Sequence, residues 1–317
     1  MPSSDPHPPV VVILGPTAVG KTQIALQLAS RLNGEIISAD SRLIYRGMDI
    51  GTAKPAPGEL ARVPHHLIDV AEPDQVWSLV LYQEAARQAI ADAQSRGHLP
   101  FIVGGTGQYI RAILEGWRAP PVSPDARLRS ILEDWAAEIG PQELHARLST
   151  LDPQAAEKID YRNLRRTIRA LEVVFTTGEP FSVQRRHGPS LYRTFLLGLT
   201  RPRTELYERI DARIEAMLAA GLVEEVQGLL ARGYDPDLPA LSAIGYKEIV
   251  DYLQGEITLQ EAGMLMKRRT RLLVRRQANW FKPDDPRIHW FQLKPGETEI
   301  IVDRIVAGIL DWKARTD

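Results

Sequence analysis

Residues 10–22 read VVVILGPTAVGKT, an apolar and mostly β-branched run that ends in the pattern G-x-x-x-x-G-K-T. The run Val10 to Leu14 is typical of a buried strand in a parallel sheet. Residues 23–32 place apolar side chains among good helix formers, which predicts a helix directly after the loop. The pattern is therefore expected in the strand–loop–helix context of a phosphate-binding loop.

This loop predicts a site for a diphosphate or a triphosphate. In such loops, successive backbone N–H groups and the N-terminus of the following helix surround the anion. Gly15 and Gly20 permit the tight backbone path. Lys21 adds a positive charge, and the Thr22 hydroxyl is placed to hold Mg²⁺. The alternative is a chance match in a glycine-containing turn, which the preceding strand and the following helix disfavour.

Two later strands indicate which kind of phosphate chemistry to expect. Residues 35–40, EIISAD, predict a strand with Asp40 at its carboxyl end, the edge at which parallel sheets bind ligands. Residues 100–103 predict a third strand, which runs into Gly104-Gly105-Thr106. A nucleotide hydrolase of this class usually has a Mg²⁺-binding aspartate at such a strand end, and this strand has none. The pattern favours a diphosphate site beside a lone carboxylate over an ATP-hydrolysing motor.

Further motifs follow along the chain in a fixed order. They are Asp40-Ser41, YRGMDIGTAKP at 45–55, PHHLID at 64–69, Gly-Gly-Thr at 104–106, RALEV at 169–173, Gly245-Tyr246, and RRQ at 275–277 with Trp280-Phe281. In this order they resemble the tRNA dimethylallyltransferases from about residue 10 to about residue 290. The run at 45–55 is far more specific than the phosphate loop. The resemblance implies transfer of a dimethylallyl group from its diphosphate to N6 of the adenine 3′-adjacent to the anticodon, with release of diphosphate.

The loop chemistry and the resemblance together assign three sets of residues. The catalytic set is Asp40, Thr106 and Lys21. The diphosphate-binding set is Gly15, Thr17, Ala18, Gly20, Lys21, Thr22 and Arg213, with Thr22 as the ligand of Mg²⁺, the expected cofactor. The tRNA-binding set is Ser41, Leu43, Thr106, Arg127, Arg166, Gly245, Tyr246, Arg275, Arg276 and Gln277.

Some of these assignments have plain structural alternatives. Thr106 is equally suited to capping a helix, and Arg213 to lying on a solvated surface. Leu43 stands where some family members have glutamine, so base readout there stays open. His65 and His66 lack acidic or thiol partners in the sequence, which favours loop packing over metal binding.

The proposed chemistry explains why a carboxylate is needed. The loop, Lys21 and Mg²⁺ neutralise the diphosphate as the allylic C–O bond breaks. N6 loses a proton on alkylation, and Asp40 is the expected acceptor, since a free aspartate is ionised at neutral pH. The alternative roles for Asp40 are a Mg²⁺ ligand or a helix cap. The adenine must leave its stack to reach the diphosphate, which requires a channel between the two substrates.

Two clusters of basic residues favour RNA as a partner. Residues 267–276, KRRTRLLVRR, contain six basic residues and no acidic one, and place Arg268, Arg271 and Arg275 near one helix face. A second cluster comprises Arg162, Arg165, Arg166 and Arg169. Such charges bind phosphates and give register without reading sequence. The alternative is a solvated basic helix face, and the overall charge of −1 gives no sign of an RNA-binding protein.

The order of elements predicts an α/β fold: a P-loop NTPase-like parallel sheet flanked by helices, with an inserted all-helical domain. We expect a disordered tail at 1–8 and the core at 9–116 and 191–317, the latter with a helical C-terminal part. The inserted tRNA-binding domain is expected at 117–190. It begins after a proline-rich break, contains four helices, and ends in a mobile loop at 177–190. A strand at 191–199 then returns the chain to the sheet.

Composition excludes several classes of protein. The 317 residues include no cysteine, which rules out disulfides, cysteine zinc sites and the zinc-finger extension of some eukaryotic members, so the resemblance is to the bacterial form. No window approaches the roughly 18 consecutive apolar residues of a membrane span, and the N-terminus has no signal-peptide core. We therefore expect a cytoplasmic protein without membrane contact. A monomer that binds dimethylallyl diphosphate and a tRNA anticodon stem-loop is the expected form.

Two other functions share the loop and the aspartate. An adenylate isopentenyltransferase acts on a free nucleotide, and a P-loop small-molecule kinase transfers phosphate. The inserted helices and the two basic clusters favour the tRNA enzyme, because a free-nucleotide enzyme has no use for them. Asp40 alone does not exclude a kinase.

Overall fold

The computed structural model describes residues 7–118, 120, 125–184 and 186–315. The chain divides into two compact units, one comprising Met1–Leu114 with Ser190–Asp317 and the other Glu115–Pro189. The predicted start of the tail, at 1–6, and most of the predicted proline-rich break, at 121–124, lie outside the described residues.

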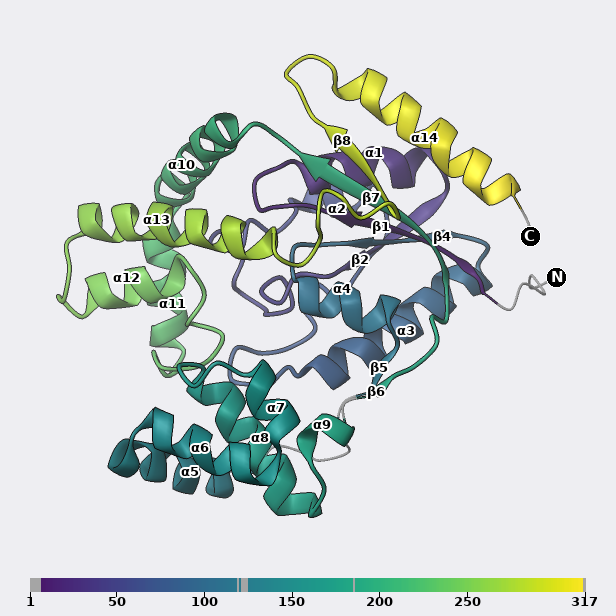
Figure 1. Ribbon diagram of the computed structural model, residues 1–317. Coiled ribbons are helices and arrows are strands. Elements are labelled where there is room, and N and C mark those ends of the chain that lie inside the picture. Colours follow the sequence, from purple (N-terminus) through teal and green to yellow (C-terminus); the bar gives the residue numbers. More distant parts are fainter. Residues whose placement is uncertain (1–6, 119, 121–124, 185, 316–317) are drawn as a thin grey trace. The chain divides into compact units, whose positions relative to one another are not determined.

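A six-stranded parallel sheet forms the centre of the first unit (Figure 1). In spatial order its strands are β3 (His65–His66), β2 (Gly34–Ser38), β4 (Leu99–Val103), β1 (Pro9–Leu14), β7 (Arg193–Thr200) and β8 (Ile288–Gln292). Strand β1 pairs with β4 and β7, and Val12 lies between Ile102 and Leu196. The predicted P-loop-type α/β fold is therefore confirmed.

The central strand is buried on both faces, which explains its continuous apolar sequence. Val11 and Ile13 belong to the core on one face, which α1 (Lys21–Arg31) and α14 (Thr298–Ala314) cover. Val10, Val12 and Leu14 belong to the core on the other face, beneath α3 (Leu79–Ser95) and α4 (Gly107–Leu114). The result is a helix–sheet–helix sandwich in which the carboxyl ends of β1, β2 and β4 lie along one edge.

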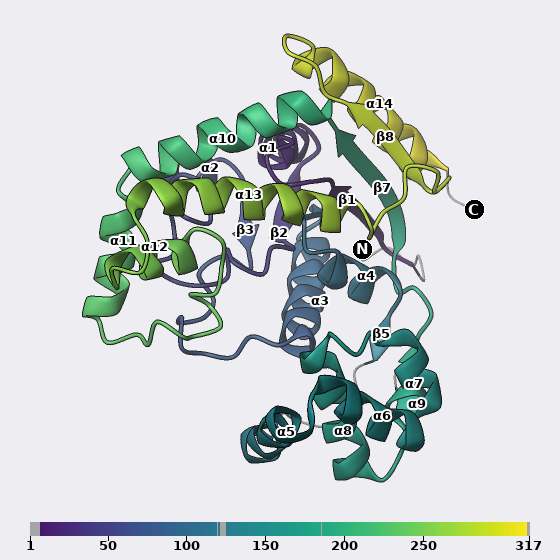
Figure 2. The ribbon, with the colours of Figure 1, turned by 60° about the vertical axis from the view of Figure 1, so that its left-hand side comes forward.

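Four helices follow β7. They are α10 (Arg203–Ala219), α11 (Leu222–Ala231), α12 (Tyr246–Leu253) and α13 (Leu259–Gln277). Helix α13 begins at Thr258, whose hydroxyl accepts the Glu261 N–H in a capping box, and it packs along α10 (Figure 2). This part is helical as predicted. The edge strand β8 and the terminal helix α14 were not predicted from the sequence.

The second unit is a helical bundle. It contains α5 (Ala126–Ile139), α6 (Pro141–Leu151), α7 (Pro153–Lys158), α8 (Leu164–Thr177) and α9 (Phe181–Gln184) around a core that includes Leu132, Leu144, Leu148 and Leu171. The four predicted helices all occur. The stretch at 177–190 was predicted to be a loop, but it contains α9 and the strand β6 (Arg186–His187). Strand β6 pairs antiparallel with β5 (Trp117–Arg118).

Candidate active site

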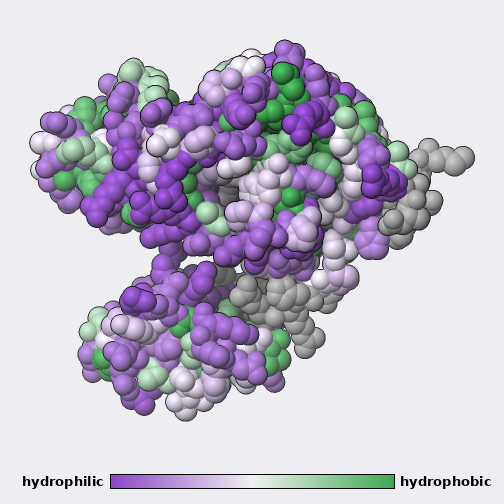
Figure 3. Space-filling view, turned by 45° about the horizontal axis from the view of Figure 1, so that its top comes forward, coloured by the Kyte–Doolittle hydropathy of each residue, from purple (hydrophilic) through white to green (hydrophobic). Residues whose placement is uncertain are grey.

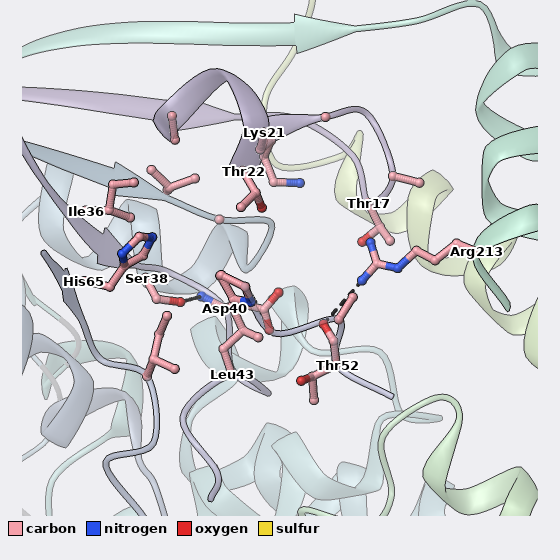
Figure 4. A pocket seen from close by; sticks show the side chains of 18 of the residues that line it. Thr17, Lys21, Thr22, Ile36, Ser38, Asp40, Leu43, Thr52, His65 and Arg213 are labelled. Atoms are coloured by element: carbon pink, nitrogen blue, oxygen red, sulfur yellow. Dashed lines mark hydrogen bonds between the residues drawn. The ribbon is translucent and has the colours of Figure 1, made fainter. Parts of the chain in front are cut away.

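A cavity of about 430 Å³ opens at the carboxyl edge of the sheet (Figure 4). One part of its wall is polar and comes from the phosphate loop, Asp40 and helix α10. Another part is apolar and comprises Ala25, Ile36, Leu43, Pro55, Ile68 and Val103, with the His65 ring beside them. Such a cavity fits a ligand with an anionic head and a short hydrocarbon tail.

The loop between β1 and α1 has the predicted backbone path. Gly15 and Gly20 have φ values of +150° and +112°, and a Cβ on Gly15 would lie 2.6 Å from the Leu199 carbonyl oxygen. Ala18 has a φ of +65°, which a non-glycine residue adopts only under local constraint. The Lys21 ammonium donates to the Gly15 and Pro16 carbonyls at 3.0 and 2.9 Å. The loop therefore contains three residues with positive φ, and the Lys21 side chain folds back to bind two of its carbonyl groups.

Lys21 is held in a site that disfavours its positive charge. Burial lowers the pKa of its ammonium to about 8; the nearby Asp40 carboxylate opposes this shift and the Arg213 guanidinium adds to it. An incoming diphosphate supplies the negative charge that this site lacks.

Asp40 follows β2 and presents its carboxylate to the cavity. One carboxylate oxygen accepts the Arg42 N–H at 2.9 Å, and the other accepts no hydrogen bond from the described residues. The Thr106 hydroxyl accepts the Ser41 N–H at 3.1 Å and lies 3.5 Å from the Ser41 hydroxyl. The Thr106 carbonyl accepts the Tyr109 and Ile110 N–H groups at 2.9 and 3.2 Å, and among the described residues no N–H of α4 donates to the Thr106 hydroxyl. The Thr106 hydroxyl is therefore directed to the residue next to Asp40 and does not cap the helix.

Helix α10 brings two arginines one turn apart to the loop. Arg209 donates to the Ala18 carbonyl at 2.9 Å, and Arg213 donates to the Thr52 carbonyl at 3.3 Å. Both line the cavity, and burial lowers the pKa of each guanidinium. Neither forms an ion pair with a carboxylate among the described residues. The surface alternative for Arg213 is thereby excluded, and Arg209 is a cavity residue that the sequence analysis missed.

A second cavity, also of about 430 Å³, adjoins the first. Four residues line both cavities: Thr17, Asp40, Thr52 and Arg213. The second cavity is otherwise lined by Ser41, Thr106 and Gln108, by apolar side chains of α10 and α13 such as Ile210, Ile214, Met266 and Leu273, and by Arg276, Gln277 and Trp280. Two ligands in the two cavities would thus meet beside Asp40.

The position of Gln277 corrects one expectation. It was assigned to the tRNA-binding set alone, and in sequence it lies 260 residues after Thr17. Its side-chain oxygen instead accepts the Thr17 N–H at 2.9 Å, and its side-chain nitrogen donates to the Gly105 carbonyl at 3.1 Å. In this structure Gln277 therefore contacts the loop directly.

Three other predicted tRNA contacts lie elsewhere. Tyr246 has no exposed surface, and its hydroxyl donates to Glu225 at 2.5 Å, so it is a core residue. Gly245 is buried at the start of α12, with a φ of +102°. Neither can contact RNA in this conformation. Leu43 lines the first cavity and is absent from the lining of the second.

Half of the basic residues at 267–276 are neutralised within the fold. Lys267 pairs with Glu215, Arg269 with the fully buried Glu248, and Arg271 with Asp211. Arg268, Arg275 and Arg276 are exposed and form no ion pair in the part of the chain that the structure describes. In the helical unit, Arg162 and Arg169 pair with acidic residues, whereas Arg127, Arg165 and Arg166 are exposed.

A magnesium ion would need oxygen atoms from a bound phosphate. Over the described ranges, no cluster of three or more His, Cys, Asp or Glu residues could hold a metal. The Thr22 hydroxyl and the Asp40 carboxylate both line the first cavity. These oxygens fit Mg²⁺, which commonly binds through few protein ligands together with substrate phosphates.

The face in Figure 3 is mostly polar, with apolar side chains in small separate groups. No helix within the described residues combines the length and the apolar character that crossing a bilayer requires.

The fold and the cavities define a class of protein, a P-loop α/β protein in which two adjoining cavities meet beside the phosphate loop and Asp40. The chain belongs to the IPP transferase family, whose model matches residues 43–284. A tRNA dimethylallyltransferase from Roseiflexus sp. (strain RS-1) is 55% identical over 274 residues, which cover 86% of this chain and 90% of the relative. One from Moorella thermoacetica is 49% identical over 316 residues, covering 97% and 96%.

Solved structures of the same family have the same fold. The tRNA isopentenylpyrophosphate transferase of Bacillus halodurans is 41% identical, with 96% of each chain covered and a TM-score of 0.72. A eukaryotic dimethylallyltransferase acting on tRNA is 26% identical, covers 98% of this chain and 81% of its own, and has a TM-score of 0.83.

Proposed function

We propose that this protein is a tRNA dimethylallyltransferase. It transfers the dimethylallyl group of dimethylallyl diphosphate to N6 of the adenine 3′-adjacent to the anticodon and releases diphosphate. The observation that carries the proposal is the pair of adjoining cavities: one contains a phosphate loop and an apolar wall, and the other meets it at Asp40.

The first cavity stabilises the leaving group. The loop N–H groups, Lys21, Arg209 and Arg213 surround the diphosphate, on which negative charge grows as the C1–O bond breaks. Thr22 would hold Mg²⁺ together with oxygens of the bound diphosphate, and the ion would supply positive charge at the leaving group. The dimethylallyl tail packs against Ile36, Ile68 and Val103.

The second cavity receives the adenine. N6 forms its bond to C1 as the C1–O bond breaks, the bonding electrons leave with the diphosphate, and the surplus N6 proton passes to the free oxygen of Asp40. Thr106 and Ser41 form the wall on the same side as Asp40. Unstacking a base costs a few kcal/mol and is cheapest in a loop, which suits an anticodon loop as the substrate.

Exposed cations bind the RNA backbone. Arg275 and Arg276 at the end of α13, and Arg127 and Arg166 on the helical unit, have no ion-pair partner in the described ranges and are free for phosphates. Both cavities are built from one chain, so we propose a monomer. We further propose that it acts in the cytoplasm, where its tRNA substrate is.

The decisive experiment offers labelled dimethylallyl diphosphate to the protein with unmodified tRNA, with AMP, or with no acceptor. We expect label in the tRNA, at the adenine after the anticodon. Label in AMP and none in tRNA would identify a free-nucleotide isopentenyltransferase. Binding of ATP in preference to dimethylallyl diphosphate would identify a kinase.

A further inference from the structure

We infer that Gln277 is a positioning residue that couples the RNA-binding end of α13 to the phosphate loop. The inference rests on the proposed function, since it concerns how that site's two substrates affect each other. It assigns Gln277 a role in diphosphate binding, which a plain tRNA contact would not have.

The side chain of Gln277 links two segments that are distant in sequence. It accepts from Thr17, the third residue of the phosphate loop, and donates to Gly105 in the turn that follows β4. The amide uses one acceptor and one donor, so both bonds fix its orientation. Thr17 and Gly105 line the second cavity with Gln277, and Thr17 also lines the first.

The turn is shaped to receive this contact. An ideal Cβ on Gly105 would lie 2.3 Å from the Gln277 side-chain nitrogen and 3.7 Å from the Lys21 ammonium. An ideal Cβ on Gly107 would lie 2.1 Å from the Trp280 ring. A Cβ at Gly107 would displace the Trp280 ring just after α13, and a Cβ at Gly105 would displace the Gln277 amide from its position near Lys21.

Two interactions with neighbouring helices fix the position of helix α13. Arg271 forms two hydrogen bonds to the Asp211 carboxylate of α10, at 2.7 and 2.6 Å, and Arg269 pairs with the buried Glu248. Arg275 and Arg276 directly precede Gln277 and are exposed. A phosphate bound to Arg275 and Arg276 would therefore restrain the last turn of α13, where Gln277 contacts the phosphate loop.

The consequence is a coupling between the two binding events. RNA bound to the end of α13 restrains Gln277, and Gln277 restrains the Thr17 N–H and the Gly105 carbonyl. The loop then loses less freedom when diphosphate binds, so RNA tightens diphosphate binding. By linkage, diphosphate tightens RNA binding by the same factor.

The test measures the affinity for inorganic diphosphate by calorimetry, with and without an unmodified anticodon stem-loop RNA. The variant is Gln277→Met, which keeps the side-chain length and removes both hydrogen bonds. Gln260→Met makes the same change at an exposed position on the same helix and serves as the control. Neither measurement needs prenyl transfer, so failure of this inference is distinct from failure of the proposed function.

We expect Gln277→Met to weaken diphosphate binding without RNA about twofold to tenfold, the usual cost of lost hydrogen bonds between neutral groups. We expect RNA to tighten diphosphate binding about fivefold or more in the wild type and in Gln260→Met, and to have no effect in Gln277→Met. Equal diphosphate affinity in Gln277→Met and wild type would overturn the inference. So would RNA without effect on the wild type, or an RNA effect that persists in Gln277→Met.

Discussion

The Arg213 guanidinium donates a hydrogen bond to the Thr52 carbonyl at 3.3 Å, and both residues line both cavities. Glu225 holds the segment just before Thr52, accepting the N–H groups of Asp49, Ile50 and Gly51 at 2.9, 2.7 and 3.2 Å. The run at 45–55, the most specific motif of the sequence, is thus held by Glu225 and forms one wall of the site. Arg213 contacts that wall from α10, and Arg209, one turn earlier on the same helix, contacts the phosphate loop.

Arg209 provides the first prediction. Arg209→Ala should raise the Michaelis constant for dimethylallyl diphosphate about tenfold to a hundredfold, because a charge-assisted contact to the diphosphate is lost. The Michaelis constant for tRNA should not change. Arg203→Ala, at the exposed start of the same helix, removes the same charge away from the cavity and should leave both constants as they are. Equal effects of the two variants would mean that Arg209 acts only through the positive charge of α10 and makes no direct contact with the diphosphate.

Asp40→Asn should keep the fold and diphosphate binding while slowing transfer by about 10² to 10⁴, the usual range for loss of a general base. Asparagine retains a side-chain oxygen for the Arg42 N–H, so the local structure should survive. Single-turnover rates at saturating substrates provide the measurement. An unchanged rate would remove Asp40 from the chemistry.

Lys21 should make the reaction sensitive to alkaline pH. Burial lowers the pKa of its ammonium to about 8, so in the free enzyme the charge that binds diphosphate is present below that pH and is lost above it. The ratio kcat/KM for dimethylallyl diphosphate should therefore fall above pH 8, whereas kcat should hold to higher pH because bound diphosphate stabilises the ammonium. Lys21→Arg keeps its charge, and its profile should lack this fall. A flat wild-type profile to pH 10 would contradict the assignment.

Tyr246 tests the correction made to the tRNA-binding set. Tyr246→Phe leaves the Glu225 carboxylate without one buried donor, which should lower the free energy of unfolding by about 1–3 kcal/mol. Urea unfolding measures this change. The affinity for tRNA, measured well below the midpoint of unfolding, should stay at the wild-type value. A stable variant with weakened tRNA binding would return Tyr246 to the RNA interface.

The sequence predicted those parts of the site that are formed by residues close together in the chain. The phosphate loop, a strand leading to Asp40 and the glycine turn before α4 are local patterns, and the structure has each of them, although β2 ends at Ser38, two residues before Asp40. Arg213 was placed by family resemblance, yet Arg209, four residues earlier on the same helix, was missed. The spacing of the two arginines was the available signal, since residues one turn apart share a helix face.

Contacts between distant segments were not predictable in this way. Gln277 contacts a residue 260 positions away, and Arg271 contacts Asp211, 60 positions away. The sequence at 267–276 contains six basic residues and no acidic one. Tertiary packing nevertheless pairs three of them with acidic residues on other helices. Burial of Tyr246 likewise depends on contacts with α11 and with the segment at 45–55. The charge on α13 that is available for RNA is therefore smaller than the sequence suggests. Of its three exposed arginines that form no ion pair in the described ranges, two, Arg275 and Arg276, lie at the end of the helix.

Arg275 tests whether this charge binds RNA. Arg275→Ala should raise the Michaelis constant for tRNA and flatten the dependence of log affinity on log salt by about one unit, because one phosphate contact is lost. The constant for dimethylallyl diphosphate should change little. Lys313→Ala removes one exposed charge from α14 and serves as the control, for which we expect the wild-type slope. Filter-binding titrations at several salt concentrations separate the two. A wild-type slope in Arg275→Ala would mean that this arginine is a solvated charge, and would leave RNA binding to the helical unit around Arg166.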